Sequence, residues 1–167
     1  MKVKLDIPYP EIKVEEENYE YADLLSQDYA GVVSETTASL LYSYQHFNTF
    51  ENNKEFSDVI EEISIVEMKH LEILGKLIKL LGKEPIYKTC NSLTDECVMW
   101  SSYNIKYDTN IKDMLITNIK GEKNAIKNYE LHKRLIKDKY ISQILLRIIL
   151  DEKIHVEIFE NLYNNIK

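Results

Sequence analysis

Apolar residues between positions 54 and 81 recur at steps of three and four, which is the spacing of a single face of an α-helix. The stripe that they define is made of Ile63, Glu67, His70, Leu74, Leu77 and Leu81. Two of its members, Glu67 and His70, are ionisable, and an acid is almost never fully buried unless it is paired. The pattern predicts a long helix whose buried face contains an acid and an imidazole.

The same arrangement returns near the end of the chain, where a glutamate and a histidine three residues later again lie on an apolar stripe. This stripe is made of Ile141, Leu145, Ile148, Glu152, His155, Phe159, Leu162 and Ile166. Two other segments place a single acid on such a stripe. One combines Glu122 with Ile111, Leu115, Ile119, Ile126 and Tyr129, and the less regular one combines Glu35 with Val32, Ser39 and Tyr42. Glu35 precedes Glu67 by 32 residues and Glu122 precedes Glu152 by 30, so the two halves resemble an internal repeat.

Breaks in these patterns divide the chain into four long helices. The expected helices cover 19–47, 54–81, 110–137 and 140–165. Gly82 ends the second helix, and residues 83–109 form a connector long enough to cross a bundle. Helices joined by a short turn must be antiparallel neighbours. We therefore predict an all-α fold: a ferritin-like four-helix bundle over 19–167, made of two antiparallel hairpins joined by a long crossover and preceded by an extended lead-in over 1–18.

Four glutamates facing one core need a source of positive charge. Each buried carboxylate costs several kcal/mol if it stays ionised and unpaired, and like charges at one level repel further. Lys and Arg are absent from these stripes near the acids. A lone Glu and a Glu-x-x-His from each hairpin form the ligand set of di-iron and di-manganese carboxylate bundles. We therefore expect two metal ions, iron or manganese, bound by Glu35, Glu67, His70, Glu122, Glu152 and His155.

Four segments carry a resemblance to a known family: "YAGVVSETTA", "EMKHLEILG", "GEKNAIKNYE" and "LDEKIHVEIF". Over residues 19–166 the chain resembles the ferritin-like superfamily, and within it the rubrerythrin-type and manganese-catalase-like proteins. The resemblance implies the same six metal ligands, with Glu67 and Glu152 as candidate bridging or chelating residues. It also implies a redox enzyme that reduces or disproportionates hydrogen peroxide, or reduces dioxygen.

The chain departs from this family in two respects. Typical rubrerythrins append a rubredoxin domain that supplies electrons, and this chain has none, so a peroxidase would need an external, rubredoxin-type donor. They also carry a second glutamate one turn after the first in the third helix, where this chain has Ala125. The "EMKH" segment is similar to the segment of bacterioferritins whose methionine binds haem. We nevertheless expect no haem and expect Met68 to pack at a helix or dimer surface.

Other polar residues have candidate supporting roles. Tyr42 and Tyr129 each follow a lone glutamate by seven residues on one helix face. Their hydroxyls either hold a ligating carboxylate or belong to ordinary core tyrosines. Asp151 is a candidate partner for the free N–H of a metal-bound imidazole. His46 and His132 are expected to lie outside the metal site, and Cys90 and Cys97 are expected to be incidental reduced thiols.

Composition limits the partners. The formal charge of −7 and the lack of a basic run exclude nucleic acid and disfavour anionic membranes. No stretch approaches the roughly 18 apolar residues of a membrane span, so we expect a cytoplasmic protein. An enzyme predicts a homodimer or small homo-oligomer, whereas bacterioferritin-like iron storage predicts a large shell. A metal-bound structural or coat protein with little turnover is the third alternative. The choice between iron and manganese stays open, because the ligand set suits both.

Overall fold

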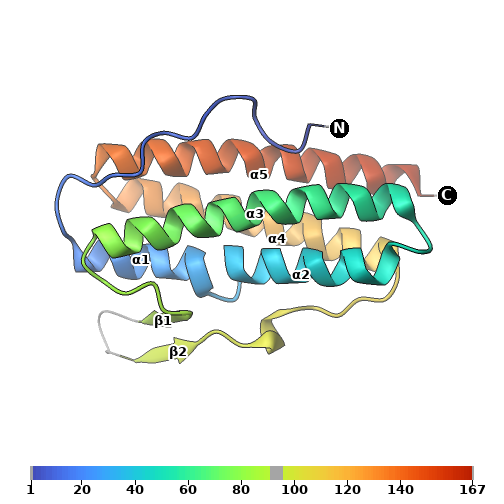
Figure 1. Ribbon diagram of the computed structural model, residues 1–167, viewed down its shortest axis with the longest axis horizontal. Helices are drawn as coiled ribbons and strands as arrows, with labels where there is room; N and C mark the ends of the chain where they lie inside the picture. The colour runs from blue at the N-terminus through green and yellow to red at the C-terminus, as the bar shows by residue number, and fades with distance from the viewer. Residues whose placement is uncertain (1, 91–95, 167) are drawn as a thin grey trace.

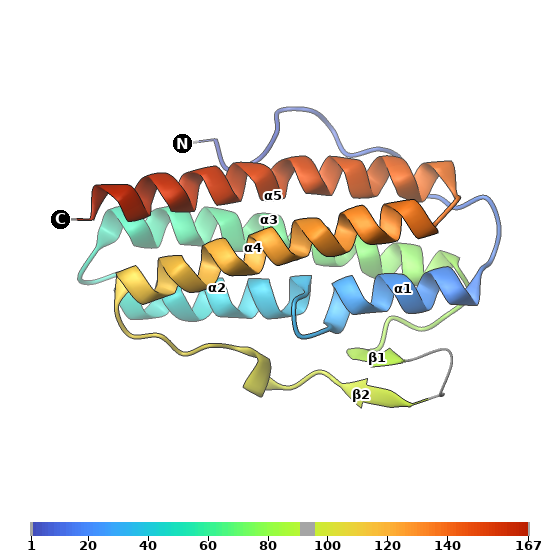
Figure 2. The same cartoon turned by 180° about the vertical axis from the view of Figure 1, so that it is seen from behind.

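A computed structural model describes residues 2–90 and 96–166 of the chain, and its helices form a bundle (Figure 1). The helices are α1 (Tyr19–Ala30), α2 (Glu35–Thr49), α3 (Lys54–Leu80), α4 (Ile111–Leu135) and α5 (Lys139–Asn165). The α2–α3 and α4–α5 hairpins are each antiparallel, and α1 continues the line of α2 (Figures 1 and 2). This arrangement confirms the predicted ferritin-like bundle with one long crossover.

Side-chain caps set the helix starts. Asn18, Asn53 and Asn110 each accept a hydrogen bond from the backbone N–H three residues on, at 2.9–3.0 Å. At the start of α5, Asp138 accepts hydrogen bonds from the N–H groups of Tyr140 and Ile141, at 2.8 and 3.1 Å. These acceptors satisfy N–H groups that the first helical turn leaves free. Gly82, with φ +95°, follows the end of α3 in the left-handed conformation that the sequence predicts there.

The prediction of one helix over 19–47 is wrong, because the chain leaves the helix between α1 and α2. Gly31 has an extended backbone, and a side chain there would collide with the Gln27 carbonyl. Ser34 then caps α2 by accepting a hydrogen bond from the N–H of Thr37. Two consequences follow. Val32, predicted to lie on a buried stripe, is 69% exposed, and Glu35 becomes the first residue of α2, where the helix dipole favours a carboxylate.

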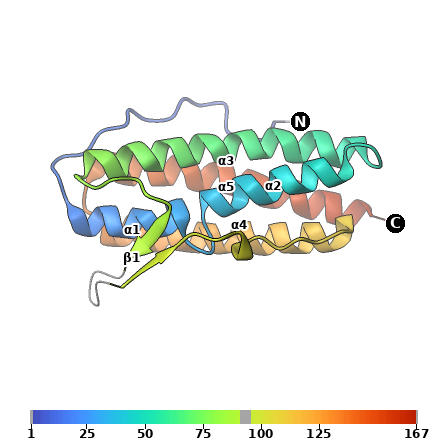
Figure 3. The same cartoon turned by 60° about the horizontal axis from the view of Figure 1, so that its bottom comes forward.

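The crossover contains a small hairpin that the sequence analysis did not predict. Strands β1 (Lys88–Cys90) and β2 (Cys97–Met99) are antiparallel, and a 3₁₀ turn, η1 (Ser102–Asn104), follows them. The register pairs Cys90 with Cys97 at a Cα–Cα distance of 4.1 Å, and the two form a disulfide. The expectation of two reduced thiols is therefore wrong, since the strand pairing brings the sulfurs together. Beyond the hairpin, the crossover runs along α4 to that helix's start (Figure 3).

Residues 2–18 contain no helix or strand and run along the bundle beside α5, on the side away from the crossover (Figures 1 and 2). The Asn18 N–H donates to the Leu81 carbonyl at 3.1 Å. Arg147 on α5 donates to the carbonyls of Leu5 and Ile7 at 2.7–3.1 Å. The lead-in is thus tied to the bundle at both ends of its path, and residues 2–9 are called the N-terminal strap below.

Two apolar clusters fill the bundle, one toward each end. One joins α1 to the second half of α3, the end of α4 and the first half of α5, and the other joins α2 to the remaining halves of α3, α4 and α5. The apolar stripe members of α3 are buried in these clusters, and those of α4 and α5 are buried or packed partly buried against them, except that Ile166 at the end of α5 is 41% exposed. Among the described residues, none of the helices combines the length and apolarity needed to cross a membrane.

Candidate metal centre

Six side chains predicted as metal ligands meet in the middle of the bundle, between the two apolar clusters. Their potential ligand atoms form two overlapping groups, and the atoms of each group lie within 4.8 Å of one another. One group is Glu35, Glu67, His70 and Glu152, and the other is Glu67, Glu122, Glu152 and His155. All six side chains are at least 97% buried. Glu67 and Glu152 belong to both groups, which is the position that a bridging residue needs.

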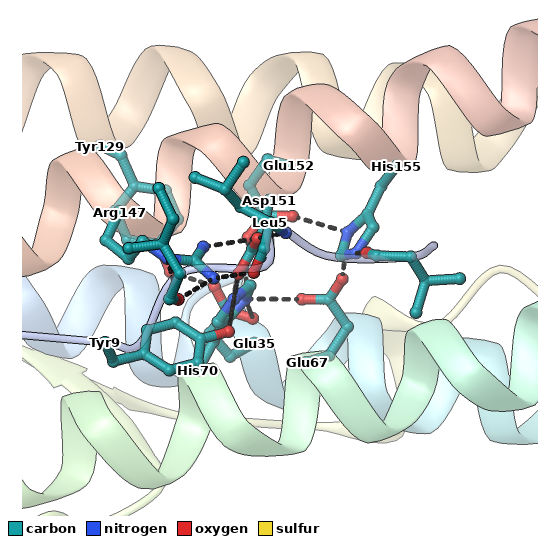
Figure 4. A network of polar contacts seen from close by, with 12 residues as sticks. Leu5, Tyr9, Glu35, Glu67, His70, Tyr129, Arg147, Asp151, Glu152 and His155 are labelled. Carbon is teal, nitrogen blue, oxygen red and sulfur yellow. Dashed lines mark hydrogen bonds and ion pairs between the residues drawn. The ribbon is translucent and has the colours of Figure 1, made fainter. Parts of the chain in front are cut away.

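The two histidines face the cluster with the same nitrogen. Nδ1 of His70 lies 3.0 Å from Glu152, 3.3 Å from Glu67 and 3.6 Å from Glu35. Nδ1 of His155 lies 2.8 Å from Glu67 and 3.0 Å from Glu152. In both rings Nε2 points away from the cluster toward the N-terminal strap, as Figure 4 shows for the labelled residues. Each imidazole therefore offers Nδ1 to the centre and keeps Nε2 for a protein partner.

Burial and crowding control the charges of the cluster. Burial, reinforced by Glu67 and Glu152, raises the pKa of Glu35 and of Glu122 well above the ordinary value. Burial also tends to raise the pKa of Glu67 and Glu152, but the two imidazoles outweigh it and lower the pKa of both. The surrounding carboxylates in turn overcome burial and raise the pKa of both imidazoles. Protons thus supply the positive charge that this crowd of acids requires.

Even with those protons, some carboxylate oxygens of the cluster lack a hydrogen-bond donor. Oε2 of Glu35 and Oε1 of both Glu67 and Glu152 are buried and accept no hydrogen bond among the described residues. Although imidazole nitrogens lie near the latter two, each Nδ1 carries one hydrogen and can direct it at only one oxygen. A buried acceptor without a donor costs about 1–3 kcal/mol. Oxygen atoms of this kind, with two imidazole nitrogens, are suitable ligands for a divalent metal.

The predicted tyrosines bond to the lone glutamates, but to those of the opposite hairpin. The Tyr42 hydroxyl donates to Glu122, and the Tyr129 hydroxyl donates to Glu35. Sequence spacing placed each tyrosine on the face of the glutamate in its own helix. Because α2 and α4 run antiparallel (Figure 1), seven residues along one helix reach the level of the other helix's glutamate. Burial raises the pKa of both phenols, which therefore stay protonated and act as donors.

Partners of the outer imidazole nitrogens come mostly from the N-terminal strap. Asp151 Oδ2 lies 3.2 Å from Nε2 of His70, as the sequence analysis suggested, and Tyr9 lies 3.1 Å from the same nitrogen. Tyr9 also donates to Asp151 at 2.6 Å, and the Val3 carbonyl lies 2.9 Å from Nε2 of His155. Sequence reasoning missed Tyr9 and Val3, because no periodicity connects an extended segment with helices more than 60 residues away.

Arg147 completes this outer layer. Its guanidinium is buried, forms an ion pair with Asp151 at 2.5 Å and lies 4.4 Å from the centre of the Tyr9 ring. Burial tends to raise the pKa of Asp151, but His70, Tyr9 and Arg147 outweigh it and lower the pKa. Arg147, the arginine close to the centre, therefore neutralises Asp151 and does not compensate the negative charge of the four glutamates.

The remaining candidates lie outside both ligand groups. His132 is buried and pairs with Asp28 at 2.6 Å, and His46 is partly buried, with Nδ1 2.9 Å from the Ser57 hydroxyl. Met68 on the outer face of α3 is 54% exposed, in keeping with the expected surface position.

Comparisons with known proteins agree with this architecture. The family model described as Rubrerythrin matches residues 29–164. A probable manganese catalase of Clostridium acetobutylicum is 26% identical over 173 residues, which cover 94% of this chain and 76% of that protein. KatB, a manganese catalase from Anabaena PCC7120, superposes with a TM-score of 0.83 at 24% identity, over 98% of this chain and 80% of KatB. Desulfovibrio desulfuricans bacterioferritin, a protein with a diiron site, gives a TM-score of 0.73 at 21% identity, over 87% and 78% of the respective chains.

Proposed function

Because the chain belongs to the rubrerythrin family, we propose that its central cluster binds two iron or manganese ions and that the protein is a peroxide-handling oxidoreductase. Hydrogen peroxide is the expected substrate, either reduced or disproportionated, and dioxygen reduction is the related alternative. One observation supports the proposal above all: two buried ligand groups overlap in Glu67 and Glu152. Such an overlap suits two ions that share carboxylates.

The residues present fit two metal ions. Glu35 and His70 would hold one ion, Glu122 and His155 would hold the other, and Glu67 and Glu152 would contact both. The buried oxygens that lack a donor would gain a cation partner, and the protons now on the imidazoles would leave, because metal ligands bind deprotonated. Bound metals would supply two-electron redox chemistry with peroxide.

The chain's own groups would orient the centre. The Tyr42 and Tyr129 hydroxyls hold one oxygen of each lone glutamate and leave the other for the centre. Asp151 and the Val3 carbonyl hold the outer nitrogens of the two imidazoles, which fixes the ring orientation. The apolar clusters cover the centre toward the two ends of the bundle and keep bulk water from those sides.

The electron source separates peroxidase from catalase. The sequence contains two cysteines, and both are used in the disulfide, so neither is a free thiolate for an iron–sulfur site. A peroxidase reaction would therefore draw electrons from a rubredoxin-type donor outside residues 1–167. Disproportionation needs no donor, and the relative named a probable manganese catalase supports that version.

Metal analysis of natively expressed protein, combined with a peroxide assay with and without a reduced donor, tests the proposal. We expect about two ions per chain, and we expect Glu67→Ala and His155→Ala to lose metal and peroxide consumption together. Glu72→Ala on the exposed side of α3 and His46→Ala on α2 are matched controls, since both residues lie outside the ligand groups. Full metal content in the first two variants would refute the site.

Iron storage is the second candidate, supported by a ligand set of the kind found in bacterioferritins and by the shared fold. The mass in solution distinguishes the two functions: storage requires a hollow shell of about two dozen subunits, whereas the enzyme is proposed to be a cytoplasmic homodimer or small homo-oligomer.

A further inference from the structure

A cavity of about 400 Å³ opens between α2 and α4 and reaches the ligand cluster. Its inner end is lined by Glu35, Glu122 and Tyr42. Its walls are mostly apolar and include Leu41 and Ala125. Ala125 lies about one turn after Glu122 on α4, and its small side chain leaves this side of the centre open.

The cavity is far larger than hydrogen peroxide requires. A water molecule takes up about 30 Å³ of liquid, so peroxide, with two oxygen atoms, needs on the order of twice that volume. A volume of 400 Å³ lies instead within the roughly 300–1,000 Å³ range of organic ligand pockets, which are mostly apolar with a few polar groups. Apolar walls give no advantage to a small polar substrate.

Gly121 in the interior of α4 supports a role for this space. Glycine destabilises a helix interior relative to alanine, so a packing requirement usually explains it. At Gly121 an added Cβ would meet no atom within 4 Å, so no neighbour requires the absence of a side chain. The residue does line the cavity, directly before Glu122. A side chain larger than alanine at this position would therefore extend into open space beside the cavity.

Positive charge lies along the cavity lining outside the cluster. The lining contains two charged residues besides the four-carboxylate centre, Lys106 and Lys120, as far as the described residues show. Lys106 is 3.2 Å from Asp108 and so is partly neutralised. Lys120 forms no ion pair or hydrogen bond with any described residue and is exposed. An apolar space with a cation at its edge is complementary to an amphiphile with an anionic head.

We propose that this cavity binds a medium-chain fatty-acid hydroperoxide, with the carboxylate at Lys120 and the alkyl chain along the apolar walls, and that such hydroperoxides are a substrate class of the centre. The proposal rests on the peroxide-handling function above. The overall change is ROOH + 2 e⁻ + 2 H⁺ → ROH + H₂O. The O–O bond breaks, the outer oxygen leaves as water with its own hydrogen and one proton from solvent, and the inner oxygen takes the second solvent proton and becomes the alcohol. A reduced one-electron iron–sulfur donor supplies the electrons in two steps.

Binding is tested on the metal-free protein by calorimetry with the unreactive probes hexanoate, octanoate and decanoate. Each added methylene that enters the cavity should tighten binding about fourfold. Decanol, which has the same chain without the charge, should bind more weakly than decanoate. Equal affinity for the three acids, or no detectable binding, would overturn the proposal.

Two variant pairs locate the probe. Gly121→Leu should fill the cavity and abolish the dependence of affinity on fatty-acid chain length. Gly121→Ala, the control, should stabilise α4 by a similar amount but leave most of the cavity volume free. Lys120→Ala should weaken decanoate about two- to fivefold, the range of an exposed ion pair, whereas Lys127→Ala removes one charge from the same helix outside the cavity. Thermal melts confirm that each variant folds. Decanoate affinity unchanged in Gly121→Leu, or lowered equally by both lysine substitutions, would contradict the proposed site.

Peroxide-consumption assays distinguish failure of the cavity proposal from failure of the proposed peroxide-handling function. With reduced donor, metal-loaded protein should consume a fatty-acid hydroperoxide at a lower half-saturating concentration than hydrogen peroxide. Hydrogen peroxide turnover without decanoate binding would overturn the cavity proposal and leave the function standing. Decanoate binding by a protein that takes up no metal would refute both the peroxide function and the hydroperoxide substrate.

Discussion

Replacing Tyr9 with phenylalanine removes one oxygen from the layer that holds His70. In the structure the Tyr9 hydroxyl donates to Asp151 at 2.6 Å and lies 3.1 Å from Nε2 of His70. The aromatic ring that the substitution retains would keep its place over Arg147, so the N-terminal strap should stay in position. The substitution therefore tests the hydroxyl alone, at a residue that is not a proposed ligand.

The expected loss follows from the contacts removed. A hydrogen bond to a charged group contributes about 1.5–3 kcal/mol, and loss of a partner that orients a metal ligand typically costs 10–100-fold in affinity. Asp151 remains within 3.2 Å of His70 in the variant, so we expect the lower end, about tenfold, or roughly 1.4 kcal/mol. His155 is held instead by Val3, so the ion beside His155 should bind almost as in the parent protein.

Competition against a chromophoric chelator measures both binding steps. We expect one of two metal equivalents to weaken about tenfold and the other to change by less than about twofold. Tyr140→Phe is the control, since that tyrosine lies at the start of α5 and its hydroxyl makes no hydrogen bond among the described residues. Unchanged affinity in both steps would show that Tyr9 does not position His70, and equal weakening of both would show that the strap acts as a whole.

Three further predictions follow from buried contacts. Arg147→Leu removes the guanidinium paired with buried Asp151 and its hydrogen bonds to the strap, while His70, Tyr9 and the Leu5 N–H stay on Asp151. Chemical denaturation should therefore show a loss of about 3 kcal/mol, the lower end of the range for breaking a buried pair, with faster hydrogen exchange confined to residues 2–9 if the bundle stays intact. Tyr129→Phe should weaken the ion beside Glu35 more than its neighbour in the same chelator titration, and the reverse order would contradict the crossed pairing. Replacing Cys90 and Cys97 with serine opens a loop of separation 7, which should lower the stability of the hairpin by about 2.5 kcal/mol, while metal content measured by mass spectrometry should stay the same.

Local spacing predicted the helices that the structure shows as α3, α4 and α5, and it paired the candidate ligands within each Glu-x-x-His. A residue and the one three positions later share a helix face whatever surrounds them, so Glu67 with His70, and Glu152 with His155, could be paired from the sequence alone. The burial of two acids per hairpin on apolar stripes then implied a shared centre, because only a compensating cation makes four buried carboxylates acceptable. The structure brings all six side chains together, and their role as metal ligands stays a prediction.

Long-range contacts determined the rest. The antiparallel course of α2 and α4 decided which tyrosine meets which glutamate, and the strand register decided that Cys90 and Cys97 pair. The strap reaches His70 across 61 residues of sequence, a distance over which no periodicity operates. Helical periodicity reports only which side chains share a face. The partners of the outward-facing atoms depend on how separate segments pack, and that arrangement exists only in the folded chain.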